Sequence, residues 1–249
     1  MKLSVISPTY NESENVGLLI AALEQTLQGM DYEIVISDDD SPDLTWAHVE
    51  EIAKRNPRVR ALRRTSNHGL GASVVDGFSL ARGEVMACID ADLQHDPGIL
   101  PKMLEEFDQG ADLVVATRYM PGGGTTNWNP FRRFASWIAT QMARLLLGVP
   151  LLDPMSGYFM LRQKDFLRVR NELDGQGFKI LLEIVAHMAP RSLREVPYTF
   201  RPRVAGQSKL SAKVIVAYLR QLWWLYAGRR GRPHVAAGVD HASKAHASK

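Results

Sequence analysis

The feature that most constrains the fold of this chain is an alternation of short apolar runs with longer amphipathic spans over its first 117 residues. The short runs predict buried strands at residues 3–7, 32–37, 59–63, 85–89 and 113–117. The longer spans carry apolar side chains at helical spacing and predict helices at residues 15–27, 44–55, 72–81 and 97–107. Alternating strands and helices are joined by right-handed crossovers, so the pattern predicts an α/β fold with a mixed, mainly parallel sheet flanked by helices.

The second half of the chain is less regular but continues the same domain. Amphipathic helices are predicted at residues 131–147, 177–188 and 213–227. No linker-like segment occurs in the first 200 residues, and a chain of 249 residues with 45% hydrophobic content can bury one large core. We therefore predict one domain over residues 1–228, ending in amphipathic helices, and a basic, disordered tail over residues 229–249.

Charge is distributed unevenly along the chain. Residues 201–249 hold ten Lys or Arg and a single acidic residue, Asp240, although the net charge of the whole chain is only +3. Such a basic end either attracts phosphate, anionic lipid or nucleic acid, or is a solvated tail. No strand interleaves aromatic with basic residues, so a nucleic-acid partner is not expected. The single cysteine, Cys88, lies in an apolar run and is predicted to be buried rather than reactive.

No segment of the chain is apolar for long enough to predict a transmembrane helix or a signal peptide. The nearest candidate is residues 214–227, which Arg220 and Gln221 interrupt. The same span contains Trp223 and Trp224, followed by three arginines. These tryptophans indicate either core packing or a helix that lies on a membrane surface, and the sequence leaves both alternatives open.

Polar side chains follow the predicted strands at the points where they end. They lie at residues 8–12, 38–43, 90–95 and 118–119. Because ligands of open parallel sheets bind outside the carboxyl ends of the strands, these residues are expected to converge on one ligand site.

Asp90 and Asp92 flank one residue directly after a predicted strand, and Gln94 adds a further oxygen. Two carboxylates at a strand end can approach one divalent cation. Mg²⁺ and Mn²⁺ prefer such oxygen ligands and often bridge to substrate phosphates. The sequence therefore predicts a divalent metal site formed by these three residues.

Three consecutive carboxylates at residues 38–40 need cations or hydrogen-bond donors nearby to offset their repulsion. They indicate either a turn with capping acids or a nucleotide contact, for which Asp39 is the candidate. The glycines at 69 and 71 begin a dinucleotide-binding fingerprint, but its third glycine is replaced by Val74. We therefore predict a helix-start turn there and not a dehydrogenase.

Eight strings in the sequence resemble the polyprenol- and dolichol-phosphate mannose synthases, which are inverting GT-A glycosyltransferases of family 2. The resemblance runs from about residue 2 to residue 225. The strings are SPTYNE (7–12), DDDSPD (38–43), DADLQH (90–95), RYMPGG (118–123), DPMSGYF (153–159), GFKILLE (177–183), EVPYTF (195–200) and GQSKL (206–210).

The resemblance implies a role for each matching residue. It implies a catalytic domain over residues 1–228, in which Asp90, Asp92 and Arg118 act at the reaction centre. A nucleotide pocket would be lined by Pro8, Tyr10, Glu12, Ser37, Asp39 and Ala91. The donor diphosphate would be held by a metal on Asp90, Asp92 and Gln94 and by a basic loop with Arg203 and Lys209. Lys179 would face the sugar, and the acceptor phosphate would be bound by Arg118, Arg132 and Ser136.

The implied activity is transfer of mannose from GDP-mannose to a polyprenyl or dolichyl monophosphate, with Mg²⁺ or Mn²⁺. A phosphate monoester, with a second pKa of about 6, is already a nucleophile at neutral pH and needs no strong general base. The resemblance also implies a peripheral position on the cytoplasmic face of a membrane, with surface contact or a membrane-anchoring subunit. The alternatives are a UDP-sugar donor such as UDP-glucose, or a non-catalytic module that binds nucleotide sugars.

Overall fold

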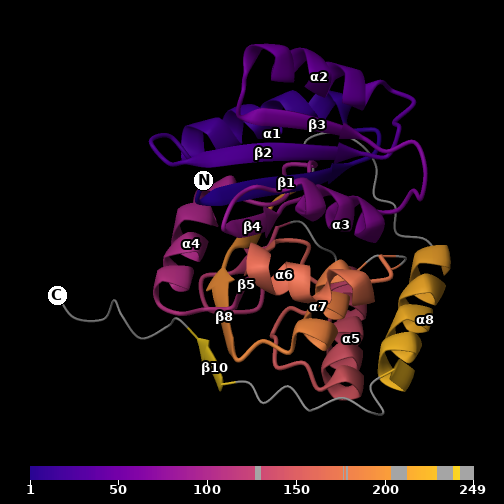
Figure 1. The fold of residues 1–249 in the computed structure, drawn as a ribbon. Coiled ribbons are helices and arrows are strands. Elements are labelled where there is room, and N and C mark those ends of the chain that lie inside the picture. Colours follow the sequence, from indigo (N-terminus) through magenta and orange to yellow (C-terminus); the bar gives the residue numbers. More distant parts are fainter. Residues whose placement is uncertain (127–129, 176, 178, 203–211, 229–237, 242–249) are drawn as a thin grey trace.

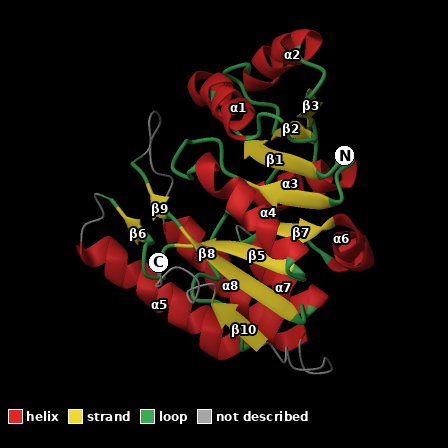
Figure 2. Cartoon of the chain, turned by 90° about the vertical axis from the view of Figure 1, so that its left-hand side faces the viewer, coloured by secondary structure: helices red, strands yellow, loops and turns green. Residues whose placement is uncertain are grey.

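A computed structural model describes residues 1–126, 130–175, 177, 179–202, 212–228 and 238–241. Its main sheet has eight strands in the order β10-β8-β5-β7-β4-β1-β2-β3 (Figures 1 and 2). The strands are β1 (Leu3–Thr9), β2 (Tyr32–Asp38), β3 (Val59–Arg63), β4 (Val85–Cys88), β5 (Leu113–Thr117), β7 (Phe159–Arg162), β8 (Ser192–Pro197) and β10 (Gly238–His241). A separate two-stranded sheet pairs β6 (Gly124–Thr125) with β9 (Thr199–Phe200).

Helices cover both faces of the main sheet because successive strand residues point to opposite sides. In β1, Leu3 and Val5 pack with α1 (Ser13–Thr26), α2 (Thr45–Arg55) and α4 (Leu100–Asp108). Ile6 belongs to the core on the other face. That core is covered by α3 (Leu70–Leu80), α5 (Pro130–Leu147), α6 (Gln163–Val169), α7 (Ile180–Met188) and α8 (Ala212–Gly228). Two short 3₁₀ turns, Pro97–Ile99 and Arg170–Glu172, precede α4 and follow α6.

The predicted α/β fold is confirmed, and so are the five strands of the first half to within one or two residues at their ends. The sheet is parallel except at β7, which pairs antiparallel with both β4 and β5. Strands β7 and β8 were not predicted from the sequence. Cys88 is buried in β4, as predicted.

Three elements differ from expectation. The predicted helix at 177–188 begins only at Ile180, because the backbone of Lys179 is not helical (φ −124°, ψ 71°) and residue 177 packs against α8. The helix predicted at 97–107 opens as a 3₁₀ turn. Within the predicted disordered tail, Gly238–His241 forms β10 beside β8, which otherwise would leave an unpaired strand edge.

Helices α5 and α8 lie side by side at the periphery of the molecule (Figure 1), and Tyr218 Oη donates to Ala139 O at 2.7 Å. Both expose apolar side chains at helical spacing. Trp223 is 68% and Trp224 46% exposed, so the core-packing alternative for these tryptophans is wrong. Among the described residues, none of the helices has both the length and the apolar character needed to span a bilayer.

Candidate active site

The loops after β1, β2, β4 and β5 meet at one edge of the sheet. These strands run parallel, so their carboxyl ends lie on the same side. Because β7 runs in the opposite direction, the segment that precedes it, residues 153–158, reaches the same edge. The predicted convergence of polar residues is therefore present in the fold.

The carboxylates at residues 38–40 are offset by different groups. Asp38 is buried and accepts hydrogen bonds from Thr9 Oγ1 at 2.8 Å and from the N–H and Oγ of Ser41 at 2.8 and 2.7 Å. Asp40 pairs with Arg63 at 2.7 Å. Asp38 thus stabilises the turn after β2 and fastens it to β1.

Asp39, the predicted nucleotide contact, is 7% exposed. Its Oδ1 pairs with Arg64 Nη1, and its Oδ2 accepts the N–H of Gly69 at 2.7 Å. Gly69 has φ +144° and directly precedes α3, which confirms the predicted helix-start turn. Asp39 therefore ties the end of β2 to the start of α3, and its contact with a nucleotide stays a prediction.

The other predicted nucleotide residues lie around the same strand ends. Pro8 and Ser37 face each other across β1 and β2, and both are buried. Ser73 Oγ of α3 donates to the carbonyl of Ser37 at 2.8 Å and contacts its Oγ at 2.9 Å. Tyr10 is 46% exposed, and the N–H of Glu12 donates to Thr45 Oγ1 at 3.0 Å.

The predicted metal ligands form a tight turn after β4. The side chain of Asp90 is 35% exposed, whereas Ala91, Asp92 and Gln94 are buried. Asp92 Oδ1 accepts the N–H of Gln94 at 3.1 Å across Leu93, whose φ of 59° is left-handed. A bulky residue in that region is uncommon and occurs preferentially at functional sites.

His95 is buried beneath this turn and supports it through one hydrogen bond and one ring contact. Its Nδ1 accepts the N–H of Asp90 at 3.2 Å, and its ring stacks on Tyr158 at a centroid distance of 5.2 Å. Burial lowers the pKa of His95 to about 4. The imidazole is therefore neutral at pH 7, with its proton on Nε2, and acts as a rigid support for Asp90.

Arg118, at the end of β5, is held by a carboxylate that the sequence analysis did not single out. Its Nε and Nη2 donate to Oδ2 and Oδ1 of Asp153 at 2.6 and 2.8 Å. The Arg118 and Asp153 side chains are 8% and 0% exposed. Burial works against the charged guanidinium, but Asp153 outweighs it and raises the pKa of Arg118. Arg118 is thus a fixed cation in a defined orientation.

Behind Asp153 lies a second buried carboxylate, Glu195 of β8. Its Oε1 and Oε2 accept the N–H of Leu152 at 3.1 and 3.0 Å, and Oε1 also accepts the N–H of Asp153 at 3.3 Å. Burial raises the pKa of Glu195 to about 7, although these donors act in the opposite direction. Glu195 therefore fixes the backbone that carries the partner of Arg118.

Lys179 brings a second cation to the site. Its Nζ donates to Met155 O at 3.0 Å, and it interacts electrostatically with Asp90, Arg118 and Asp153. Burial lowers the pKa of Lys179, and the Asp90 and Asp153 carboxylates partly oppose this. The structure thus gathers two carboxylates of the predicted metal site and two predicted cations at one strand edge.

The remaining predicted residues are only partly described. Ser136 Oγ of α5 lies 3.0 Å from Tyr119 Oη, so the start of α5 approaches the residue after Arg118. The backbone of Arg132 belongs to α5, but its side chain lies outside the described residues, as do Arg203 and Lys209.

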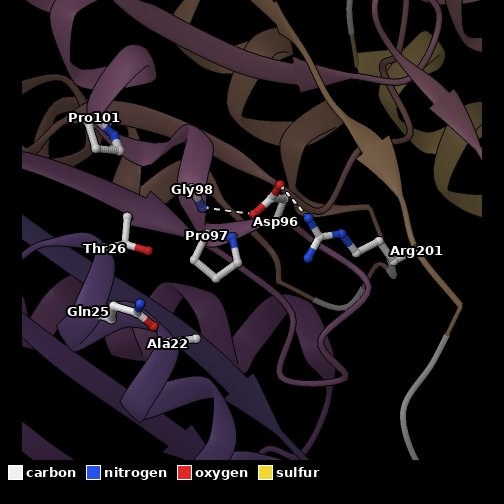
Figure 3. A pocket seen from close by; sticks show the side chains of 8 residues that line it. All are labelled: Ala22, Gln25, Thr26, Asp96, Pro97, Gly98, Pro101 and Arg201. Atoms are coloured by element: carbon white, nitrogen blue, oxygen red, sulfur yellow. Dashed lines mark hydrogen bonds and ion pairs between the residues drawn. The ribbon is translucent and has the colours of Figure 1, made fainter.

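A hollow of about 520 Å³ lies between α1 and the segment after the Asp90–His95 turn (Figure 3). Arg201 lines it and pairs with Asp96 at 2.8 Å. The Gln94 side chain donates to Arg201 O at 3.0 Å, and the Arg201 N–H donates to Gln94 O at 2.9 Å. The chain leading toward Arg203 is therefore fastened to the metal-site turn as far as Arg201.

Sequence reasoning missed the roles of Asp153 and Glu195. Both begin strings that carried the resemblance, DPMSGYF and EVPYTF, and each is an acidic residue beside apolar ones. That pattern was a usable sign of a buried, paired carboxylate, since such groups are rarely buried without a partner.

Comparisons with known proteins place this site in a family. The model described as Glycosyl transferase family 2 matches residues 4–170. A dolichol-phosphate mannosyltransferase of Saccharomyces cerevisiae is 40% identical over 93% of this chain and 89% of its own length. A polyprenol monophosphomannose synthase of Mycolicibacterium smegmatis is 38% identical over 94% of this chain and 90% of its own. A dolichol-phosphate mannosyltransferase of Pyrococcus furiosus is 43% identical over 90% of this chain, which spans 64% of that relative.

A solved structure shares the fold at greater distance. Glucosyl-3-phosphoglycerate synthase from Mycobacterium tuberculosis aligns with a TM-score of 0.63 and 18% identity over 93% of this chain and 81% of its own. The family match covers more than half of the chain, and close relatives span nearly all of it. The chain therefore belongs to glycosyl transferase family 2, with dolichol-phosphate mannosyltransferases among its homologues.

Proposed function

We propose that this chain transfers mannose from GDP-mannose to a polyprenyl or dolichyl monophosphate, with inversion at the anomeric carbon. The observation that carries the proposal is the cluster of Asp90, Asp92, Arg118 and Lys179 at one strand edge. Relatives that are 38–43% identical over at least 90% of this chain are named dolichol-phosphate mannosyltransferase or polyprenol monophosphomannose synthase.

The proposed reaction joins two anions, so positioned cations matter more than a base. The acceptor phosphate is largely dianionic at pH 7 and attacks the anomeric carbon without deprotonation by the protein. Arg118, held in orientation by Asp153, would bind that phosphate through its guanidinium group, whose geometry matches phosphate oxygens. Lys179 would face the sugar and the diphosphate, where negative charge grows as the donor bond breaks. The nucleotide would contact the residues at the ends of β1 and β2 around Asp39.

The residues after β4 fit a divalent metal. Among the described residues, no group of three or more His, Cys, Asp or Glu side chains could enclose an ion. Two carboxylates with one partly exposed member suit Mg²⁺ or Mn²⁺, which complete their coordination with substrate phosphate and water. Asp90, Asp92 and Gln94 would hold the ion, and it would offset charge on the leaving diphosphate.

Four further predicted contact residues belong to this proposal. Arg203 and Lys209 would close over the diphosphate from the segment that Arg201 fastens to Gln94. Arg132 and Ser136 would reach the acceptor phosphate from the start of α5, since Ser136 lies beside Tyr119.

The outer faces of α5 and α8 support a peripheral position on the cytoplasmic face of a membrane, where the lipid acceptor resides. The exposed large apolar side chains, most of them at helical spacing, are Phe134, Trp137, Ile138, Leu145 and Leu146 on α5 and Val216, Leu219, Trp223, Trp224 and Tyr226 on α8. Many exposed apolar side chains on two neighbouring helices are typical of a surface that contacts a membrane or a partner. Exposed Arg133 and Arg220 beside them suit an anionic surface or an anchoring subunit.

The test is transfer of labelled mannose from GDP-mannose to a polyprenyl phosphate, with Mg²⁺ and then with EDTA. Formation of an extractable mannolipid that EDTA abolishes is expected, and Asp90→Asn should lower the rate at least about a hundredfold. Asp108→Asn, an exposed change far from the site, is the matched control and should leave the rate unchanged. Product from UDP-glucose only would overturn the proposed donor. Tight nucleotide binding without transfer from any donor would indicate the non-catalytic module.

A further inference from the structure

Gln221 is a buried polar side chain on the inner face of α8 that neither the family match nor the proposed function uses. It is 7% exposed. Its Oε1 accepts the N–H of Lys179 at 3.3 Å, and its Nε2 donates to Lys179 O at 3.2 Å. The same Nε2 donates to Glu183 Oε1 of α7 at 3.0 Å. One side chain of α8 therefore binds both main-chain groups of Lys179.

A glycine makes room for this contact. A Cβ at Gly177 would lie 2.0 Å from Gln221 Nε2 and 2.2 Å from its Cδ, so a larger residue would displace the amide. The Gln221 amide can therefore occupy this place only while residue 177 is glycine. Gly177→Ala is therefore a second way to break the contact while Gln221 itself is retained.

The segment held by Gln221 is also packed against the nucleotide side of the fold. Glu183 Oε2 accepts the N–H of Gly175 at 3.2 Å. The carbonyl oxygens of Gly175 and Gly177 would lie 2.5 and 2.7 Å from a Cβ on Gly71, in the first turn of α3. Gly175, Gly177 and Lys179 thus lie between α3, whose preceding residue binds Asp39, and α8.

The side chain of Lys179 points from this segment into the site. Its Nζ is hydrogen-bonded to Met155 O at 3.0 Å and interacts with Asp90 and Arg118. We propose that Gln221 is a positioning residue, which fixes the main chain of Lys179 so that its ammonium group faces the reacting phosphates and sugar. This inference rests on the proposed function, and it couples the exposed aromatic helix α8 to the centre of the site.

A double-mutant cycle on kcat tests whether Gln221 acts through Lys179. Gln221→Ala removes two hydrogen bonds to Lys179 and is expected to lower kcat about tenfold. In a Lys179→Ala background the same change is expected to lower kcat less than twofold, because the ammonium it positions is gone. Gln163→Ala is the matched control, since Gln163 also bridges two elements, with Nε2 donating to Ala81 O at 2.7 Å, but lies away from the site.

Hydrogen exchange of the Lys179 amide provides a readout that does not depend on the reaction. Gln221→Ala and Gly177→Ala should both speed its exchange, and Gln163→Ala should not. Unchanged exchange would overturn the inference whatever the activity. Faster exchange with equal losses of kcat in both backgrounds would also overturn it, because Gln221 would then be merely structural. If the wild-type chain transfers no sugar, the proposed function fails, and with it the positioning role, even where the exchange result confirms the contact.

Discussion

The buried pair of Arg118 and Asp153 predicts a large loss of stability from a small chemical change. Asp153→Asn keeps the shape of the side chain but removes its charge. Both carboxylate oxygens accept hydrogen bonds from the guanidinium, and the two side chains are 0% and 8% exposed. The buried Arg118 charge then loses the carboxylate that mainly compensates it, which costs about 3–5 kcal/mol in unfolding free energy.

Urea denaturation measures this loss directly. With a slope of about 3 kcal/mol per M, the midpoint should fall by about 1–1.7 M. Asp108→Asn is the matched control, because Asp108 pairs with Lys2 at 3.3 Å while the two side chains are 65% and 49% exposed. An exposed pair of this kind contributes less than about 1 kcal/mol.

A double replacement separates stability from activity. Arg118→Met with Asp153→Leu removes both charges, and should recover most of the stability that Asp153→Asn loses. It should nevertheless transfer no sugar, because the proposed acceptor site loses its cation. A midpoint shift for Asp153→Asn no larger than that of Asp108→Asn would refute the reasoning.

Two further perturbations follow from buried groups. Burial raises the pKa of Glu195 from 4.5 to about 7, so its contribution to stability is complete below pH 4.5 and is lost as the pH rises through 7. Urea denaturation between pH 5 and 8 should show that the unfolding free energy declines by roughly 2.5 kcal/mol, and Glu195→Gln should abolish this decline. An equal decline in the variant would assign the effect to other groups. Gly71→Ala should cost about 1–3 kcal/mol, because its Cβ would meet two carbonyl oxygens at 2.5 and 2.7 Å. Gly124→Ala, where a Cβ meets nothing within 4 Å, is the control, and equal thermal midpoints for the two variants would contradict the predicted clash.

The first half of the fold could be predicted because its signals are local. Each strand from β1 to β5 is a short segment next to a helix in the sequence. The strand β7 is also a short apolar segment followed by a helix, but its antiparallel place between β4 and β5 depends on pairing with residues more than 40 positions away. Local sequence therefore carries little information about the direction and place of β7.

The candidate site divides in the same way. Asp90, Asp92 and Arg118 were predictable because they directly follow strands whose ends must meet. The partners that orient them were not, since Asp153 reaches Arg118 from a loop and Gln221 reaches Lys179 from the last helix. Residue type and spacing do not specify which buried donor meets which acceptor across the fold.

The antiparallel strand β7 divides the main sheet into two groups of parallel strands. Strands β4 and β5 are joined within the sheet only through β7, which pairs with one on each side. The connection from Arg118 to Tyr158 starts at the end of β5 and returns to the same edge of the sheet at the start of β7. Both of its ends are therefore fixed by neighbouring strands. A chimera in which residues 118–158 are exchanged between relatives keeps the pairing of β1, β2, β3 and β4. Under the proposed function, acceptor preference could therefore change through residues 118–158 while the strands that carry the proposed nucleotide contacts stay constant.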